Sequence, residues 1–402
     1  MTAVFSRGIA ILAVGIACLA TAYAQVDRQV KIGILNDQTG PLSALSGPGS
    51  VAAARLAIED AGGSLFGKPI QLVVGDHTNK PDVGSAIARR WYDTEGVGAV
   101  FDIYSSGVAL AVQKVTAEKD KILVTTSSSR DLTGKSCTPN SFHWTNDGYS
   151  IANLILKSAS GSKPNSWFFL TVDYAAGHGA EADARQMVQT AGGTVTGSVR
   201  FPLGSPDFSS FLLQAQASKA KNIGFIGGGA DVINATKQAV EFGIQKGGQS
   251  YVPFTLTSED VFALGNRTAA GLPVITTFYW DDSAAAKTWT ERFKKVTGKM
   301  PTDPQANVYS AVLHYLKAVK AANTTDTKAV IEKMKSTPVQ DFFTAGAKIR
   351  DDGRLMRAAY YATAKSPEQM KNPEDIMTIV KRYTGEEAFM PVAINECPLL
   401  KK

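Results

Sequence analysis

The stretch "VKIGILNDQTGPLSALSGPGSVAAARLAIEDAGG", residues 30–63, decides the fold class of this chain. In residues 30–37, alternating polar and apolar side chains give way to an apolar run, which predicts a short strand. Residues 50–63 carry Ala and Leu at helical spacing. Two glycines end that segment, which is a common way for a helix to stop. The stretch therefore predicts a strand, a loop rich in Gly, Pro and Ser, and a helix.

The same unit recurs through the first third of the chain. Further strands are predicted at residues 70–76, at residues 97–104 and in "KILVTT" from residue 121, and helical segments separate them. Strands that alternate with helices over short connections are typical of a parallel sheet wrapped by helices on both faces. We therefore expect an α/β fold.

A second set of strands and helices begins after Asn146, and from residue 280 the pattern changes to long helices. "DDG" at residues 351–353 predicts a hairpin turn near the C-terminus. We expect two doubly wound α/β lobes, of which lobe 1 takes residues 25–146 plus 280–338 and lobe 2 takes residues 147–279 plus 339–402. Ligands of open parallel sheets bind beyond the carboxyl ends of the strands, so the site is expected between the lobes.

The length and composition fit this two-lobed interpretation. The chain has 402 residues, which is more than one hydrophobic core usually serves, and its 44% hydrophobic and 19% charged residues are ordinary for a globular protein. The formal net charge is +6, and without Arg7 of the N-terminal segment 41 basic residues stand against 36 acidic ones. The basic residues are scattered rather than clustered with aromatic residues, so no nucleic-acid binding is expected.

The first 24 residues predict an export signal that is cleaved from the mature protein. Arg7 is their only charge, residues 8–22 are an apolar core too short to span a bilayer comfortably, and the segment ends at Ala24 in a small-x-small pattern. We therefore expect a periplasmic protein cleaved near Ala24, with a lipid anchor on Cys18 as the alternative. No later run approaches ~20 apolar residues, so no other membrane anchor is expected.

Two cysteines, Cys137 and Cys397, remain after removal of the signal. An even pair of cysteines in an oxidising compartment predicts a disulfide. This bond would tie the C-terminal residues to a loop far back in the chain. The alternative is a pair of free buried thiols.

Clustered hydroxyl groups follow two strands predicted in the first lobe, in "DIYSSGVAL" and in "KILVTTSSSRDL". The hydroxyl residues are Ser105 and Ser106 after the first strand, and Ser127, Ser128 and Ser129 after the second. If the two strands are neighbours, these hydroxyls and the free amides at a helix start would bind one carboxylate. The alternative for the first loop is a serine that only caps its helix. Behind the second loop, Arg130 and Asp131 are expected to pair at the surface.

The strands of the second lobe end in residues that would contact other parts of a ligand. Tyr174 follows one strand, Asp231 follows a run of three glycines, and Glu259 follows a third strand. The Glu259 carboxylate would receive an ammonium group, unless it is only a helix-start Glu that the helix dipole favours. Tyr279, within "TTFYWDD", is expected either to form a stacking wall where the chain crosses between lobes or to belong to the core.

Motifs of enzymes and of metal sites are missing from the sequence. It has no G-x-S-x-G, P-loop, H-E-x-x-H or C-x-x-C motif, and its four histidines are too scattered for metal ligands or a Ser/His/Asp triad. We therefore expect no enzyme, no metal and no cofactor. An exported two-lobed protein without catalytic motifs is expected to bind a ligand.

Several segments together resemble the branched-chain amino acid (leucine/isoleucine/valine-binding) type of periplasmic solute-binding protein of ABC importers. They are the export signal, the stretch at residues 30–63, the Ser-Ser loop, "RDLTGKSCTPNSFHW" and "PTDPQANVYSAVLHYLKAV". The likeness covers essentially the whole mature chain. It implies a type I periplasmic binding protein fold, in which two α/β lobes joined by three crossings close on a ligand by hinge motion.

The resemblance also implies roles for single residues. In this family a Ser that falls on Ser105 or Ser106 holds the ligand carboxylate, together with backbone and hydroxyl groups that fall on residues 127–129. The acid that binds the ammonium group of amino acids falls on Glu259. A second-lobe Tyr that follows paired glycines in amino acid binders is absent, and Asp231 lies in that segment instead.

The function that the resemblance implies is capture of a small carboxylate for an ABC importer. The ligand would be a branched-chain or other amino acid, or an aromatic carboxylic acid such as benzoate, for which "TFYW" would form a wall. The expected partners are the membrane permease subunits, and the receptor itself is expected to be a monomer. The alternative is a ligand-sensing domain that signals to a membrane partner.

Overall fold

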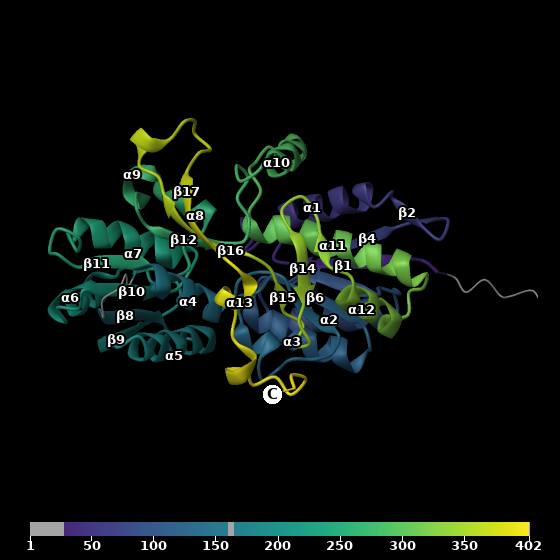
Figure 1. Cartoon of the computed structure of the whole chain (residues 1–402), viewed down its shortest axis with the longest axis horizontal. Coiled ribbons are helices and arrows are strands. Elements are labelled where there is room, and N and C mark those ends of the chain that lie inside the picture. Colours follow the sequence, from purple (N-terminus) through teal and green to yellow (C-terminus); the bar gives the residue numbers. More distant parts are fainter. Residues whose placement is uncertain (1–27, 160–164, 402) are drawn as a thin grey trace, which may run out of the picture.

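Two sheets of parallel strands, one in each lobe, form the framework of the molecule (Figure 1). A computed structural model describes residues 28–159 and 165–401. The predicted export signal, with its cleavage site near Ala24 and the alternative lipid anchor on Cys18, lies outside the described residues. Among the residues that are described, no helix is both long and apolar enough to cross a membrane.

The first sheet has five parallel strands in the order β4-β1-β5-β6-β7. Its strands are β1 (Lys31–Asn36), β4 (Gln71–Asp76), β5 (Ala99–Asp102), β6 (Ile122–Thr125) and β7 (Ser141–His143). The helices around it are α1 (Gly47–Asp60), α2 (Pro81–Asp93), α3 (Ser106–Glu118), α10 (Ala284–Thr297), α11 (Asp303–Ala322) and α12 (Thr327–Ser336). A short hairpin of β2 (Ser64–Leu65) and β3 (Lys68–Pro69) follows α1. The predicted neighbours β5 and β6 pair directly, so their two strand ends lie side by side.

Helices cover both faces of the first sheet, because neighbouring residues of a strand point to opposite faces. On β1, Ile34 belongs to the core that α1 and α11 share. The next residue, Leu35, packs on the other face with Trp91 of α2 and Val108 of α3. The late helix α11 therefore completes a lobe that begins at the N-terminus of the described chain.

The second sheet has four parallel strands in the order β11-β10-β8-β9. Its strands are β8 (Ser166–Val172), β9 (Thr194–Phe201), β10 (Asn222–Ile226) and β11 (Ser250–Pro253). The helices of this lobe are α4 (Gly148–Ala159), α5 (Ala175–Thr190), α6 (Ser209–Ala217), α7 (Ala230–Glu241), α8 (Ser258–Leu264) and α9 (Asn266–Ala269). The alternation of strands and helices, read from the sequence, thus continues through both lobes.

Antiparallel strands make up most of the C-terminal part. One sheet joins β12 (Pro273–Thr276), β16 (Ala359–Ala364) and β17 (Met377–Tyr383), and another joins β13 (Val339–Gln340), β14 (Ala345–Ile349) and β15 (Leu355–Met356). The predicted "DDG" turn links β14 to β15. Gly353 in this turn has a φ of 85°, and a Cβ atom there would lie 2.1 Å from the Ser141 carbonyl oxygen. Only glycine therefore lets the turn pack against β7.

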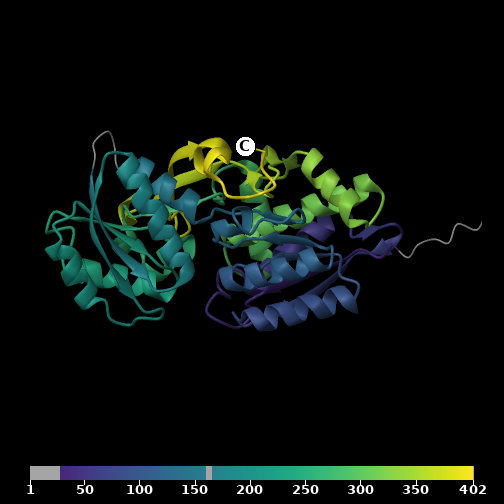
Figure 2. The same ribbon diagram turned by 90° about the horizontal axis from the view of Figure 1, so that it is seen from below.

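The chain crosses between the lobes three times: before α4, after β12, and between β15 and β16. Figure 2 shows two bodies that are joined along the side where the C-terminal segment, in yellow, lies. This segment runs through α13 (Gly385–Ala388), and Asn395 Nδ2 then donates to the Thr133 carbonyl of the first lobe at 3.1 Å. A disulfide joins Cys397 to Cys137, with 5.7 Å between the Cα atoms. The C-terminal segment therefore returns to lobe 1.

The exact share of each lobe in the C-terminal part stays a prediction. Residues 339–402 are predicted to belong to lobe 2, yet β13 contacts α11 and β14 contacts α12. Both helices belong to the first lobe. The contacts therefore favour placing residues 339–349 with lobe 1, whereas β16 and β17 pair around β12.

Some elements differ from the sequence-based expectation, such as α1, β7 and β17. Helix α1 begins at Gly47, ahead of the predicted start, because Pro48 suits the first turn, where an amide donor has no partner within the helix. The strands β7 and β17 were not predicted individually. β7 is only three residues long, and β17 carries exposed polar residues that hide its strand pattern.

Candidate functional site

The carboxyl ends of three strands in the first sheet bring the predicted hydroxyl groups together. Ser106, after β5, and Ser127, after β6, have their Oγ atoms 3.0 Å apart. Ser105 donates through Oγ to Asn79 Oδ1 at 2.5 Å, which links it to the loop after β4. Ser105 therefore does not cap α3 with its side chain. The predicted meeting of the two serine loops is present in the structure.

The backbone has an unusual conformation at the end of β5, just ahead of the Ser-Ser loop. Asp102 and Ile103 have φ values of 81° and 55°, a left-handed conformation that is rare for a β-branched residue such as Ile. The buried Asp102 carboxylate accepts hydrogen bonds from Thr126 Oγ1 at 2.6 Å and from Asn36 Nδ2 at 2.8 Å. Burial raises the pKa of Asp102. Such backbone persists where surrounding contacts hold it, and it tends to mark functional sites.

One hydroxyl hydrogen of the serine pair has no acceptor within the pair. Ser127 Oγ accepts from the Ser129 amide at 3.1 Å, and the two Oγ atoms share one hydrogen bond. Two hydroxyls carry two hydrogens, so the second hydrogen has no acceptor within the pair. Ser127 is fully buried and Ser106 is partly exposed, so Ser106 is the hydroxyl of the pair that can reach a group outside it.

The other two serines of the row have different surroundings. Ser128 is partly exposed, and its carbonyl accepts from the Gly148 amide at 2.9 Å, at the start of α4. Ser129 precedes the 3-10 helix η1 (Arg130–Thr133) and is mostly buried. Of the three predicted residues 127–129, it is Ser127 that contacts the Ser-Ser loop directly.

On the second lobe, Glu259 lies in the first turn of α8. The helix cap is built from other residues, since Thr257 and Asp260 exchange the reciprocal hydrogen bonds of a capping box. Ser258 Oγ donates to the Glu259 carboxylate at 3.0 Å. Burial, followed by the charges of Asp260 and Asp303, raises the pKa of Glu259 to about 7. Within the described part of the chain, Glu259 has no ion pair with Lys or Arg.

Tyr104, which the sequence analysis did not select, joins the two sides of the site. It follows β5 and immediately precedes Ser105. Burial raises its pKa, and so do the nearby charges of Asp260, Asp303 and Glu259. A first-lobe side chain thus lies close to the second-lobe acids Asp260 and Glu259. Tyr104 could have been selected from the sequence because it stands at a predicted strand end, next to the two serines.

Tyr174 and Asp231 lie together on the second lobe. Tyr174 precedes α5 and is 45% exposed, and burial of part of the ring and the Asp231 charge raise its pKa. Asp231 is only 2% exposed, and its Oδ2 accepts from the Gly204 amide at 3.0 Å. Asp231 Oδ1 has no hydrogen-bond partner among the described residues. Tyr174 is therefore accessible, whereas Asp231 holds a loop of its own lobe.

Tyr279 lies in the core, in agreement with the alternative interpretation of "TTFYWDD". It is 5% exposed, and its hydroxyl accepts from the Met377 amide of β17 at 3.4 Å. Its ring packs against Trp280, with 4.7 Å between the ring centroids. Burial raises the pKa of the Tyr279 hydroxyl. Its position thus offers no open face for a ligand wall.

A pair of charges joins the lobes beside the serine row. The predicted surface pair between Arg130 and Asp131 is wrong, because Arg130 contacts Asp183 of α5 at 2.8 Å and Asp131 contacts Lys135 at 3.2 Å. Asp183 is almost fully buried, and burial raises its pKa to about 6 although Arg130 opposes this effect. The ion pair Arg130–Asp183 therefore spans from lobe 1 to lobe 2.

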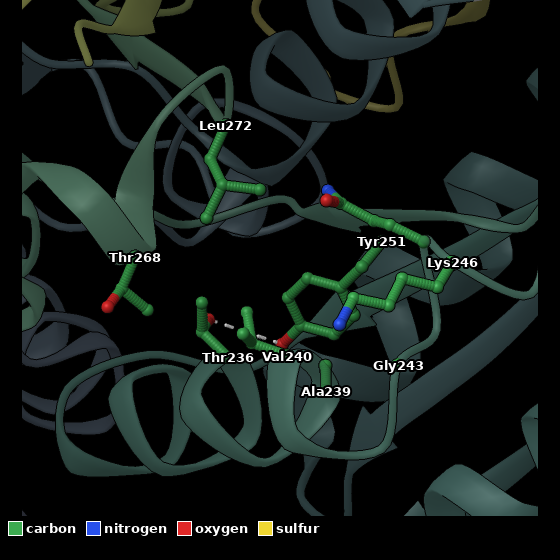
Figure 3. A pocket seen from close by; sticks show the side chains of 9 residues that line it. Thr236, Ala239, Val240, Gly243, Lys246, Tyr251, Thr268 and Leu272 are labelled. Atoms are coloured by element: carbon green, nitrogen blue, oxygen red, sulfur yellow. Dashed lines mark hydrogen bonds between the residues drawn. The ribbon is translucent and has the colours of Figure 1, made fainter. Parts of the chain in front are cut away.

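A small cavity in the second lobe is separate from these residues (Figure 3). It measures about 80 Å³, lies between α7, β11 and α9, and includes Thr236, Tyr251 and Leu272 in its wall. None of the predicted site residues lines it. Small-molecule sites usually measure roughly 300–1,000 Å³, so this cavity is smaller than a typical ligand site.

A family model described as periplasmic binding protein matches residues 29–369. The chain belongs to this family. A periplasmic binding protein from Burkholderia mallei is 37% identical, with a TM-score of 0.87, and covers 93% of this chain and 100% of that chain. A branched-chain amino acid ABC transporter periplasmic ligand-binding protein from Burkholderia xenovorans is also 37% identical, with a TM-score of 0.86, and covers 92% of this chain and 100% of that chain.

More distant periplasmic binding proteins are similar over most of the chain. The Leu/Ile/Val-binding protein homolog 6 of Brucella melitensis is 25% identical over 341 residues, which cover 82% of this chain and 85% of that protein. A solute-binding protein from R. palustris in complex with 4-hydroxybenzoate is 18% identical, with a TM-score of 0.79 over 88% of this chain and 97% of that one, and shows the fold alone. The predicted family and the two-lobed type I fold are thus confirmed, and this family is one of solute-binding proteins rather than of enzymes.

Proposed function

We propose that this periplasmic binding protein captures a small carboxylate between its lobes and delivers it to the permease subunits of an ABC importer. Binding makes or breaks no covalent bond. The ligand stabilises the closed arrangement of the lobes, because only that arrangement contacts it from both sides.

The observation that carries this proposal is the Ser106–Ser127 hydroxyl pair, with 3.0 Å between its Oγ atoms. The pair leaves one hydrogen free, and the first-turn amides of α3 add donors because no side chain caps them. Donors without acceptors suit a carboxylate. The neutral hydroxyls also avoid the cost of burying a positive charge next to the ligand.

The second lobe supports an amino acid as the ligand. Glu259 is an acid whose pKa is raised to about 7, near Asp260 and Asp303, and no basic side chain among the described residues pairs with it. A buried acid without a cation is stabilised when a ligand brings an ammonium group. An aromatic carboxylic acid is the second candidate, supported by Tyr104 and the accessible ring of Tyr174.

A thermal-shift assay with matched compounds tests the proposal. L-leucine and 4-hydroxybenzoate are compared with leucinol and phenol, which lack the carboxylate, and the melting temperature is measured for each. A ligand that binds only the folded protein raises the melting temperature by mass action. We expect a rise for at least one carboxylate and none for its partner. Equal rises for both members of a pair would contradict carboxylate capture.

A further inference from the structure

A buried cluster contacts the serine row through the backbone carbonyl of Ser127. Its members are His143 at the end of β7, Thr145 and Asp147 in the first crossing, and Arg354 beside the third crossing. His143 is fully buried, and Arg354 is 1% exposed. Burying an arginine is costly unless all of its donors are paired, so this position calls for an explanation.

The donors of Arg354 meet several acceptors from the β7–α4 segment. Nη1 donates to the Thr145 carbonyl and Nη2 to the Asp147 carboxylate, each at 2.5 Å. Nη2 also lies 2.6 Å from His143 Nδ1, and the guanidinium stacks 4.7 Å from the Phe389 ring centroid. Arg354 therefore ties the first crossing to the third.

The contact with Arg354 fixes the tautomer of His143. Arginine can only donate, so Nδ1 must be the unprotonated nitrogen and Nε2 carries the hydrogen. Nε2 points at the carbonyl oxygen of Ser127 and donates to it. Burial and the Arg354 charge lower the pKa of His143 well below its usual value, so the ring stays neutral.

Thr145 Oγ1 donates to the neighbouring Thr126 carbonyl at 2.8 Å and lies 3.3 Å from the Ser127 carbonyl oxygen. Arg354 thus holds His143, which donates to the Ser127 carbonyl, and Thr145, which donates to the adjacent Thr126 carbonyl. The position of this peptide in turn places Ser127 Oγ against Ser106 Oγ. The charged groups around the cluster are Arg354, Asp147, Asp352 and Arg350.

We propose that His143 and Arg354 are positioning residues for ligand binding. They fix the position of the Ser106–Ser127 hydroxyl pair relative to two of the crossings between the lobes. The proposal rests on the function proposed above, because it assigns the pair to the ligand. Neither residue touches the ligand. A change at the crossings would reach the serine pair through these contacts.

Substitution of His143 tests the proposal, and the three variants are His143→Gln, His143→Leu and His314→Leu. Gln keeps one donor and one acceptor, whereas Leu keeps only bulk. His314 is the control, a buried histidine of α11 whose Nε2 contacts the Met334 carbonyl at 2.9 Å and which does not contact Ser127. Hydrogen exchange of the Ser129 amide, which donates to Ser127 Oγ, reports on the serine pair without any ligand.

We expect His143→Leu to speed exchange of the Ser129 amide by about tenfold or more, and His143→Gln and His314→Leu to change it little. Calorimetry with L-leucine and 4-hydroxybenzoate as probes should show a loss of about tenfold or more in affinity for His143→Leu only. A folded His143→Leu protein with unchanged exchange, or a His143→Gln protein as impaired as it, would overturn the proposal.

A measurement on the wild-type protein tests the proposal even if the His143→Leu variant does not fold. Nitrogen-15 NMR of the histidine rings should show His143 neutral and protonated at Nε2, and a ring protonated at Nδ1 would overturn the proposal. If neither probe binds the wild type, the proposed ligand class fails. The exchange rate and the tautomer still decide the role of His143 in that case.

Discussion

The two sides of the interlobe site differ in how their polar groups are satisfied. On the first lobe, Ser105, Ser106 and Ser127 are neutral and bonded to one another or to Asn79. On the second lobe, Glu259 is an acid whose pKa is raised because burial and neighbouring acids disfavour its charge. The polar groups of the first side are already satisfied in the ligand-free protein and can donate to an anion. The acid of the second side has no cation to pair with. Under the proposed function, the second lobe therefore decides which class of ligand binds.

Glu259→Gln should have the largest effect on the second side. If the ligand brings an ammonium group, the variant leaves that charge unpaired, and binding should weaken by about 3–5 kcal/mol. Isothermal titration with L-leucine measures the change. Glu332→Gln, at an exposed position on α12, is the matched control and should bind as the wild type does. Full affinity for an amino acid in Glu259→Gln would rule out the ammonium role.

The pH dependence of binding also tests the role of Glu259 on the second lobe. An ammonium ligand needs the ionised carboxylate, and the pKa of Glu259 is about 7. Affinity for L-leucine should therefore fall about tenfold per pH unit below that value and level off above it. Calorimetric titrations at pH values from roughly 5 to 8 measure this change in affinity. In Glu259→Gln the affinity should no longer depend on pH in this way. Asp260, with a pKa raised to about 6, remains in the variant, so the difference between the profiles belongs to Glu259.

The stability of the ligand-free protein should carry the same signature. The folded-state pKa of Glu259 lies above its ordinary value of 4.5, so its protonation stabilises the folded state. This contribution is complete below the ordinary value and is lost as the pH rises through about 7. Melting temperatures should therefore fall over this range more steeply in the wild type than in Glu259→Gln. Identical slopes would show that burial does not raise this pKa.

Ser106→Ala tests the first side and should have a smaller effect. Loss of a hydroxyl that donates to the ligand carboxylate should weaken binding by about 1–3 kcal/mol. Ser105→Ala is the comparison, because its hydroxyl is already used by Asn79 and its loss should change affinity less. Calorimetry on both variants measures the two affinities and shows which hydroxyl contacts the ligand. A larger loss for Ser105→Ala would move the ligand donor to that residue.

Asp183→Asn should have the smallest effect, because it changes only a contact between the lobes. The variant weakens the Arg130–Asp183 ion pair, and ligand affinity should fall by about 1 kcal/mol as the closed arrangement loses this contact. Asp131→Asn is the control, since its partner Lys135 is in the same lobe. If both variants lower affinity equally, the interlobe pair has no special part in closure.

Much of the fold followed from local pattern, because helical and strand periodicities reflect which face is buried. The predicted pairing of the two serine loops also followed, since β5 and β6 are consecutive strands of one sheet. The cluster around Arg354 did not, because its parts come from segments about 200 residues apart and meet only through the crossings. Tyr279 was ambiguous for a similar reason: its hydroxyl partner, Met377, lies in a strand that the pattern did not reveal.

Carboxylate capture between the lobes can be checked by a crystal structure of the protein with the tightest carboxylate from the thermal-shift comparison. We expect the ligand between the lobes, with a carboxylate oxygen within hydrogen-bonding distance of Ser106 Oγ and its other end beside Glu259 or Tyr104. A ligand bound elsewhere, such as beside Tyr251 in the second-lobe cavity, or one whose carboxylate faces Glu259, would contradict it.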